Sequence, residues 1–262
     1  MNFKNKTIAF LGAGNMAEAL IRGLLAAKIV PAAQIIAHDI RTNRLEELRK
    51  TFGIRTGKPE ADIIILAVKP QQMSTALSGI KPAGLFISIA AGITTAQIEK
   101  ELGGRPRIIR AMPNTPALVG AGAAAIAAGR FALLEDLVIA ETILQAVGTV
   151  VRVEEKDLDA VTALSGSGPA YIFLVAEALI AAGIAEGLAP VIAQRLAFQT
   201  ILGAALLLWE GKDGPAELRR KVTSPGGTTE AAVTVLLAQK LPEIFVEAVT
   251  AAAKRSRQLA GQ

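Results

Sequence analysis

The sequence lacks cysteine and holds a single histidine, His38, in 262 residues. The absence of thiols excludes disulfide scaffolds, cysteine-ligated zinc, iron–sulfur sites and cysteine nucleophiles. One imidazole is too few for a histidine-rich metal centre, so we predict no metal site. One Tyr and one Trp give no aromatic platform for nucleic acid, and the basic residues behind the net charge of +5 are scattered. We therefore predict no nucleic-acid partner.

Hydrophobic runs that could cross a membrane are also scarce. The run Leu196–Trp209 is apolar but shorter than the ~20 residues that span a bilayer. The uncharged run 111–129 is interrupted by prolines and glycines. The first residues lead into a strand pattern without a separate apolar segment and cleavage site. We expect no membrane partner and a cytoplasmic protein.

Apolar residues, by contrast, make up 52% of the chain, which is enough for a sizeable core. Within residues 1–153, short β-rich runs alternate with helical segments. The β-rich runs are 7–11, 34–38, 63–68, 85–89, 107–111 and 150–153, and the helical segments include 15–27 and 94–102. This alternation predicts an α/β fold, with an N-terminal Rossmann-type parallel sheet covered by crossover helices.

Residues 154–262 contain no strand pattern and predict a second, all-helical domain. The stretch 169–209 contains three charged residues, Glu177, Glu186 and Arg195. Helices that are apolar around most of their circumference must be buried nearly all round. Because about 110 residues cannot cover that much apolar surface alone, we predict that this domain forms an obligate homodimer.

The strongest local motif follows the first predicted strand. It is G-x-G-x-x-A, formed by Gly12, Ala13, Gly14, Asn15, Met16 and Ala17. A glycine at position 12 allows a tight turn, a glycine at position 14 leaves room for a pyrophosphate, and Ala17 lets helix and sheet approach closely. The N–H groups of the first helical turn can then bind the anion. In this position the motif favours a dinucleotide cofactor over a glycine-rich turn without a ligand.

The second predicted strand ends where the ribose of such a cofactor is recognised. Asp39 would accept hydrogen bonds from a free 2′-hydroxyl and favours NADH. Arg41 or Arg44 would hold the 2′-phosphate of NADPH. At this point both cofactors stay open.

Two further loops follow strand ends, where open α/β sheets bind their ligands. Ala67, Val68, Lys69 and Pro70 end one strand, and Ala90 and Ala91 follow the next. Small residues here would let a flat nicotinamide ring lie close to the backbone. Ordinary turn formation explains the same residues.

A glycine-rich turn in the helical half precedes a helix expected near residue 230. Its N–H groups and hydroxyls could bind a carboxylate through charge-assisted hydrogen bonds. The residues concerned are Ser224, Gly226, Gly227, Thr228 and Thr229. A helix start without a ligand explains the same pattern.

Taken together, the motifs resemble those of pyrroline-5-carboxylate reductases. The motifs Gly12–Ala17, Ala67–Pro70, Met112–Pro116, Leu164–Tyr171 and Val222–Thr229 occur in the order and spacing of that family, and the resemblance runs from about residue 7 to about residue 258. It implies reduction of the cyclic imine 1-pyrroline-5-carboxylate to L-proline, the last step of proline biosynthesis, usually with NADPH and in some members with NADH. It also implies a homodimer, and dimers that assemble into a larger ring, a decamer of dimers.

The resemblance further implies the roles of individual residues. Thr229 is expected near the ring nitrogen of the substrate, and Ser224 in the same pocket, as the catalytic residues. The backbone of Gly226, Gly227 and Thr228 is expected to receive the carboxylate. Expected cofactor contacts come from Gly12, Ala13, Gly14, Asn15, Met16, Asp39, Arg41, Ala67, Val68, Lys69, Pro70, Ala90, Ala91 and Asn114. Some relatives carry a glutamate where this chain has Lys212, so that position receives no role.

Two other functions are compatible with the first motif. Oxidoreductases that resemble 3-hydroxyacid dehydrogenases share it, but they use a lysine early in the second domain, and none occurs between Asp157 and Gly211. A non-catalytic NAD(P)-binding scaffold that keeps the fold is the alternative from a different class.

Overall fold

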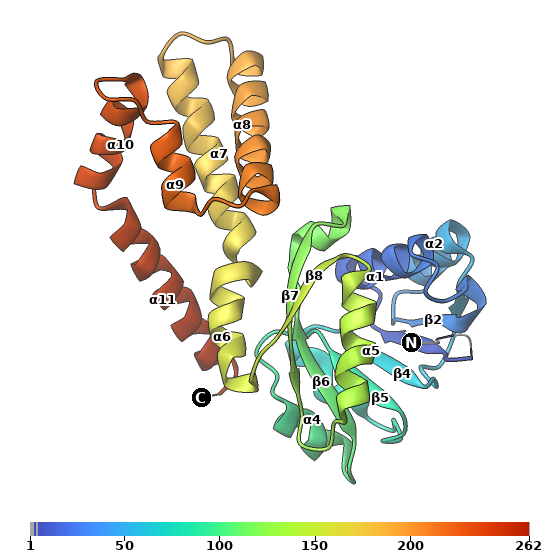
Figure 1. Ribbon diagram of the computed structural model, residues 1–262. Helices are drawn as coiled ribbons and strands as arrows, with labels where there is room; N and C mark the ends of the chain where they lie inside the picture. The colour runs from blue at the N-terminus through green and yellow to red at the C-terminus, as the bar shows by residue number, and fades with distance from the viewer. Residues whose placement is uncertain (1–2, 4, 262) are drawn as a thin grey trace. The chain divides into compact units, whose positions relative to one another are not determined.

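The computed structural model describes residue 3 and residues 5–261, and the chain divides into two compact units (Figure 1). The sheet unit holds the described residues up to Ser167 together with those from Ala251 onward. The helical unit is Gly168–Thr250. The sequence places the domain boundary at residues 153 and 154, directly after the last strand. The boundary between the compact units lies further along the chain, after Ser167. The residues from Ala251 onward belong to the sheet unit again.

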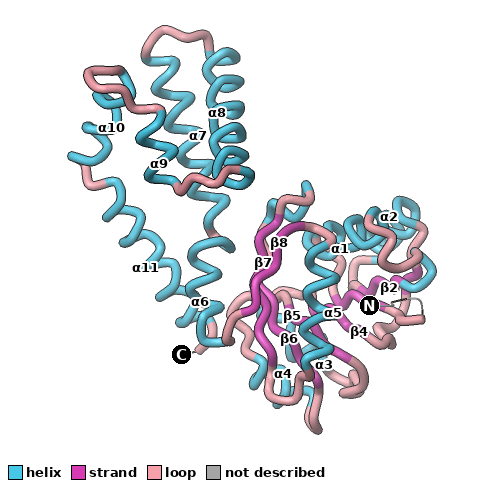
Figure 2. Tube along the Cα trace, viewed as in Figure 1, coloured by secondary structure: helices cyan, strands magenta, loops and turns pink. Residues whose placement is uncertain are grey.

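The sheet unit contains an eight-stranded sheet in the order β3-β2-β1-β4-β5-β6-β7-β8. Figure 2 draws its strands in magenta. Its strands are β1 Ile8–Leu11, β2 Ile35–His38, β3 Arg55–Thr56, β4 Ile63–Leu66, β5 Leu85–Ser88, β6 Arg107–Met112, β7 Gly122–Ala128 and β8 Gly148–Arg152. All neighbouring pairs are parallel except β6 and β7, which are antiparallel. The prediction of a parallel sheet is therefore correct for the nucleotide-binding strands and wrong at β7, an alanine-rich strand with weak β-propensity.

Helices cover both faces of this sheet. Their bounds are α1 Asn15–Ala26, α2 Thr42–Phe52, α3 Met73–Leu77, α4 Thr95–Leu102, α5 Leu134–Gln145 and α6 Leu158–Val161. Apolar side chains of α1, α2 and α5 pack in one core with Ile8 and Phe10. Those of α3 and α4 pack in a second core with Ala9 and Leu11. Because β1 is buried on both faces, its four residues are all apolar.

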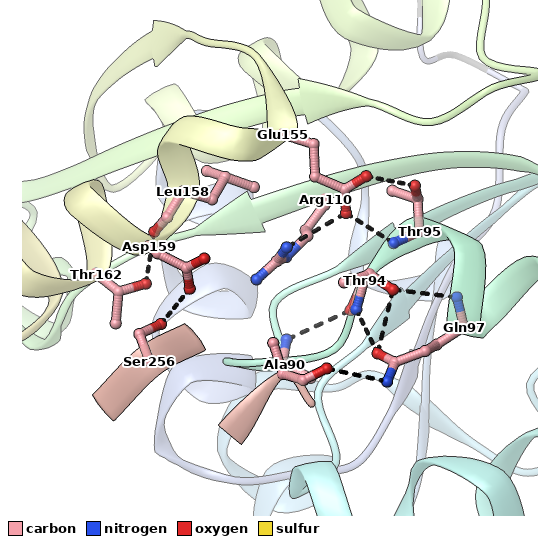
Figure 3. Close-up of polar contacts among 12 residues, drawn as sticks. Ala90, Thr94, Thr95, Gln97, Arg110, Glu155, Leu158, Asp159, Thr162 and Ser256 are labelled. Carbon is pink, nitrogen blue, oxygen red and sulfur yellow. Dashed lines mark hydrogen bonds and ion pairs between the residues drawn. The ribbon is translucent and has the colours of Figure 1, made fainter. Parts of the chain in front are cut away.

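The end of the chain packs within the sheet unit, near the first turn of α4. Glu155 accepts hydrogen bonds from the N–H of Thr95 at 2.8 Å and from its hydroxyl at 2.6 Å, and it pairs with the buried Arg110 at 3.3 Å (Figure 3). The buried Ser256 hydroxyl donates to Asp159. These contacts hold the residues after β8 and the C-terminal helical turns against the sheet.

The helical unit has little core of its own. It contains α7 Gly168–Ala185, α8 Pro190–Glu210, α9 Pro215–Lys221, α10 Thr228–Ala238 and the first part of α11 Leu241–Leu259. Its fully described residues include three buried side chains, all alanine: Ala176, Ala193 and Ala197. Large apolar side chains on α7 and α8, such as Phe173 and Phe198, are exposed.

Two helical stretches are long and apolar enough to cross a membrane by length and composition, Glu155–Ala185 and Pro190–Glu210. In each, 11% of the most apolar window is buried. Leu196–Trp209, predicted to be too short for a membrane span, belongs to a longer helix, because α8 has 21 residues and begins at Pro190. The prediction from length is therefore wrong. The same exposure agrees with helices that another protein surface covers.

Candidate active site

The turn after β1 brings three strand ends together. Gly12 has φ +101°, and a Cβ there would lie 2.5 Å from the Ala67 carbonyl oxygen at the end of β4. Only glycine fits this backbone and this approach. The Gly12 N–H also donates to the carbonyl of His38 at the end of β2, at 2.8 Å. The sheet order reverses between β1 and β4, which is where open α/β sheets bind nucleotides.

The start of α1 fits a phosphate group. Gly14 is its N-cap, and no atom lies within 4 Å of the place where a Cβ would stand. The first-turn N–H groups, beginning at Asn15, have no partner within the helix. Ala17 is fully buried against the sheet, which brings the helix close. The arrangement matches the role predicted for the Gly12–Ala17 motif.

A cavity of about 490 Å³ opens beside this turn. Of the predicted cofactor residues, Gly12, Asp39 and Val68 line it. Lys69 and Pro70 are not among its lining residues, and Pro70 begins a short helical turn, Pro70–Gln72. That turn and α3 supply lining residues that the sequence analysis missed, Gln71, Gln72, Thr75 and Ala76. A proline at the start of a helical turn, after a strand end, is the signal that could have found them.

Asp39 turns back toward the glycine-rich turn. Its carboxylate accepts a hydrogen bond from the Ala13 N–H at 2.8 Å and hydrogen bonds from the Arg41 side chain at 3.0 Å. The Arg41 guanidinium holds the pKa of Asp39 well below its usual range. The Asp39 carboxylate therefore already has partners within the protein.

The remaining predicted cofactor residues of the sheet unit differ in their surroundings. Ala90 is buried after β5, and its N–H meets the Ser88 hydroxyl at 3.4 Å. The Asn114 side chain is used within the protein: it donates to the Ser165 carbonyl at 3.0 Å and accepts from the Ala123 N–H at 2.8 Å. Each end of the Asn114 amide thus makes one hydrogen bond within the protein and keeps a second donor or acceptor position, so a cofactor contact from this side chain stays a prediction.

Two motifs that are distant in the sequence meet at this point. Asn114 belongs to the Met112–Pro116 motif, and Ser165 to the Leu164–Tyr171 motif. A Cβ at Gly166 would lie 2.6 Å from Cε of Met112, so the two segments pack directly. The second motif begins inside a π-helical stretch, Thr162–Gly166, a distortion that often occurs at functional sites.

The turn Ser224–Thr229 lies in the helical unit and is closed on itself. The Gly226 N–H donates to Glu230 Oε2 at 2.7 Å, and the Gly227 N–H donates to the Ser224 carbonyl at 3.0 Å. The expectation that these two N–H groups are open to a ligand is therefore wrong in this structure. A Cβ at Gly227 would lie 2.5 Å from the Ser224 hydroxyl oxygen and 3.0 Å from its carbonyl oxygen, so a side chain there would crowd the turn.

The N–H groups that could still bind a carboxylate are those of Thr228 and Thr229, the two residues after Gly227. Helix α10 begins at Thr228, with Gly227 as its N-cap. The N–H groups of Thr228 and Thr229 belong to its first turn, where the helix dipole attracts anions. The Glu230 carboxylate is bound by the Gly226 N–H just before this helix end and leaves the N–H groups of Thr228 and Thr229 unoccupied by it. Thr229 is half-buried, and within the described chain its hydroxyl has no hydrogen-bond partner. An anion-binding helix end with a neighbouring hydroxyl can hold and orient a small carboxylate ligand.

The comparisons with known proteins agree with this division. A family model described as pyrroline-5-carboxylate reductase dimerisation matches residues 155–259, and one described as NADP oxidoreductase, coenzyme F420-dependent, matches residues 7–92. A pyrroline-5-carboxylate reductase from Synechocystis is 43% identical, with 96% of this chain and 97% of that protein covered. The chain belongs to the pyrroline-5-carboxylate reductase family.

Solved structures of the family have the same fold. A pyrroline-5-carboxylate reductase from Coxiella burnetii matches with a TM-score of 0.92 and 40% identity, over 98% of this chain and 99% of that one. A pyrroline carboxylate reductase from Plasmodium falciparum, solved with NADP bound, matches with a TM-score of 0.86 and 30% identity, over 98% and 99% of the two chains. The resemblance found in the sequence and the predicted fold class, an α/β sheet domain with a helical dimerisation domain, are confirmed.

The family's dimerisation region starts at residue 155, two residues after the predicted end of the first domain. The compact helical unit starts later, at Gly168, because Glu155 and Asp159 are held by the sheet unit. As for metals, the described residues hold no group of three or more His, Asp or Glu side chains that could bind an ion. That a metal takes no part stays a prediction.

Proposed function

We propose that this chain reduces the imine of 1-pyrroline-5-carboxylate to L-proline with a nicotinamide cofactor, NADPH or NADH. The observation that carries the proposal is family membership at 43% identity over 96% of the chain. It is supported by the open phosphate-binding turn of the sheet unit and by the anion-accepting start of α10 in the helical unit.

The residues that would hold the cofactor lie at the carboxyl ends of β1, β2 and β4. The first turn of α1 would bind the pyrophosphate, and the cavity lined by Gly12, Val68 and Thr75 would receive the adenosine. When bound, the reduced nicotinamide supplies a hydride to the imine carbon. Turnover therefore requires the cofactor edge of a sheet unit to meet a Ser224–Thr229 turn, of the same chain or of a partner.

The residues of the helical unit would hold the substrate. The N–H groups of Thr228 and Thr229 bind its carboxylate at the positive end of α10. The Thr229 hydroxyl oxygen accepts a hydrogen bond from the N–H of the protonated imine and orients the C=N bond. Ser224 shapes the turn through its contact with Gly227. As the hydride forms the new C–H bond, the C=N π electrons pass to nitrogen, and the protonated imine becomes the amine of proline.

The assembly belongs to the same proposal. The dimerisation region and the exposed apolar faces of α7 and α8 support a homodimer. The larger ring, a decamer of dimers, stays a prediction, as do the cytoplasmic location and the absence of nucleic-acid and membrane partners. No observation on the described residues favours the alternative function, an oxidoreductase that resembles 3-hydroxyacid dehydrogenases.

The test combines an assay with one substitution. NADPH and NADH absorbance is followed with added 1-pyrroline-5-carboxylate, in the native chain and in Thr229→Val. Removing one hydrogen bond to a charged group should lower kcat about 10- to 100-fold, with cofactor affinity unchanged. The matched control is Thr234→Val, an exposed threonine on the same helix, which should keep native kcat.

Two results would count against the proposal. Native turnover in Thr229→Val would remove that hydroxyl from the reaction. A folded dimer that oxidises neither NADPH nor NADH would favour the scaffold alternative.

A further inference from the structure

The carboxylate of Asp39 has no acceptor position left for a ribose. An ionised carboxylate offers about four lone-pair sites on its two oxygens. Oδ1 accepts from the Arg41 backbone N–H at 2.9 Å and from Arg41 Nε at 3.0 Å. Oδ2 accepts from the Ala13 N–H at 2.8 Å and from Arg41 Nη2 at 3.0 Å. With its side chain 9% exposed, Asp39 cannot bind a 2′-hydroxyl unless Arg41 leaves it.

Arg41 is the group that this arrangement presents outward. Its side chain is 56% exposed and follows Ile40, which lines the cavity beside the glycine-rich turn. A guanidinium has five N–H donors in a fixed plane. Two are bound to Asp39, so three remain, and two of these lie side by side at the tip, one on Nη1 and one on Nη2. A planar, partly filled fork of this kind suits a phosphate, which accepts several hydrogen bonds at once.

Arg44, the other candidate for the 2′-phosphate, is committed elsewhere. Its Nε donates to the Ala13 carbonyl at 2.9 Å, and its two terminal nitrogens pair with Glu18 and with Glu47, the latter at 2.7 Å. Its side chain is 14% exposed. Arg44 therefore ties the glycine-rich turn to α1 and α2 and has no free edge to offer a ligand.

We propose that Arg41 is the residue that selects the cofactor, through the 2′-phosphate of NADPH, and that Asp39 is a positioning residue that holds Arg41 rather than a reader of the ribose. An acidic residue at the end of the second strand usually favours NADH, whereas in this chain Asp39 would support binding of NADPH. The proposal rests on the proposed function only in that the ligand is a nicotinamide dinucleotide.

The test measures binding of two cofactor fragments, 2′,5′-ADP and 5′-AMP, to the full chain by calorimetry. The native chain should bind 2′,5′-ADP at least about 10-fold more tightly than 5′-AMP, since charge-assisted hydrogen bonds to the phosphate distinguish the two. Arg41→Ala should lose that preference, because binding of 2′,5′-ADP weakens while 5′-AMP keeps or gains affinity as Asp39 is released. The matched control is Arg49→Ala, an arginine of α2 with a similarly exposed side chain, which should keep the native ratio.

Asp39→Asn separates the two roles of the carboxylate by the sign of its effect. If Asp39 positions Arg41, the variant weakens 2′,5′-ADP binding more than 5′-AMP binding. If Asp39 reads the ribose, the variant weakens 5′-AMP binding and strengthens 2′,5′-ADP binding, which overturns the proposal. A folding defect would lower both affinities and leave the ratio unchanged.

Native 2′,5′-ADP affinity in Arg41→Ala would also overturn the proposal, as would a native chain that prefers 5′-AMP or does not bind 2′,5′-ADP at millimolar concentration. Because these fragments carry no nicotinamide, the outcome is independent of imine reduction. A chain that distinguishes the fragments as expected but reduces no imine would contradict the proposed function and leave the role of Arg41 intact.

Discussion

The sheet unit and the helical unit differ most in what they bury. In the sheet unit, large side chains such as Phe10 and Phe86 are fully buried between helices and strands. In the helical unit, the buried side chains are three alanines, although α7 and α8 are long and predominantly apolar helices. Burial of apolar area is the main driving force of folding. The sheet unit can therefore hold its ligand-binding edge by itself, whereas the helical unit needs another surface to become stable.

The two units also build their sites differently. The cofactor edge is fixed by contacts between strand ends, such as Gly12 against Ala67. The Ser224–Thr229 turn is fixed mainly by its own hydrogen bonds, from Gly226 to Glu230 and from Gly227 to Ser224. A site that depends on local bonds in an unstable unit becomes rigid only when the unit is covered. Catalysis should therefore depend on the dimer more than nucleotide binding does.

The largest effect is expected from charges placed on the exposed face of α8. Phe198 and Leu202 lie one turn apart on this helix and are 52% and 53% exposed. In Phe198→Asp with Leu202→Asp, covering the helix would bury two unpaired carboxylates. The dimer should weaken about 30-fold or more, since disrupting central apolar anchors costs roughly 2–4 kcal/mol. Analytical ultracentrifugation over a range of concentrations measures this.

The matched control for that pair is Leu134→Asp in the sheet unit, where an exposed leucine starts α5. Its side chain is 79% exposed, and an acidic residue suits the first turn of a helix. This variant should sediment like the native protein. If the α8 variant also sediments as the native dimer, the apolar face of α8 is not the covered surface and the comparison between the units fails.

A smaller effect is expected from the link between Ser256 and Asp159. Both residues are buried, and the Ser256 hydroxyl is the donor. Ser256→Ala leaves a buried carboxylate oxygen without this partner, which costs about 1–3 kcal/mol. Urea unfolding measures the loss, and earlier proteolysis of the C-terminal turns should accompany it.

Ser74→Ala is the control for this prediction, because Ser74 makes the same kind of bond to Glu101 at 2.9 Å on the surface. Its cost should stay below about 0.5 kcal/mol, as for most surface substitutions. Equal costs at the two positions would show that the end of α11 does not belong to the sheet unit.

Local patterns made the sheet unit largely predictable. The Gly12–Ala17 motif needs its glycines for backbone reasons that act within a few residues, and β1 and β4 appear as short apolar runs. Strand β7 escaped prediction because alanines and a glycine replace the β-branched residues that mark strands. The packing of the chain end on the sheet unit was not predicted, for a different reason. Ser256 and Asp159 are 97 residues apart, and a contact over that distance produces no periodic pattern in the sequence.

The sequence predicted which residues lie at the candidate site better than it predicted what each of them does. The sequence singled out Asp39, Arg41 and Arg44 but could not rank them, since the ranking depends on which way each side chain turns. The same limit applies to the Ser224–Thr229 turn. Its glycines were identified, yet the occupation of the Gly226 N–H depends on a rotamer of Glu230.

The smallest expected effect concerns Asp62, which links the starts of β1 and β4. Its carboxylate accepts hydrogen bonds from the Thr7 N–H at 2.7 Å and the Thr7 hydroxyl at 2.8 Å. The bond from the Thr7 backbone lowers the pKa of Asp62 below its ordinary value. A lowered pKa in the folded state stabilises the fold above the unfolded-state pKa of about 4, and this contribution is lost as the pH falls through the folded-state value.

Asp62→Asn should therefore be less stable than the native chain at pH 7, by less than about 1 kcal/mol because the group is exposed and screened by solvent. The difference should shrink as the pH is lowered from 5 toward 3, and urea unfolding at each pH follows it. Thr7→Ser keeps both the hydroxyl and the backbone donor and should leave the pH dependence unchanged. A stability difference that is the same at pH 3 and pH 7 would mean that the ionised carboxylate does not stabilise this edge, and that packing alone joins the two strands of the sheet unit.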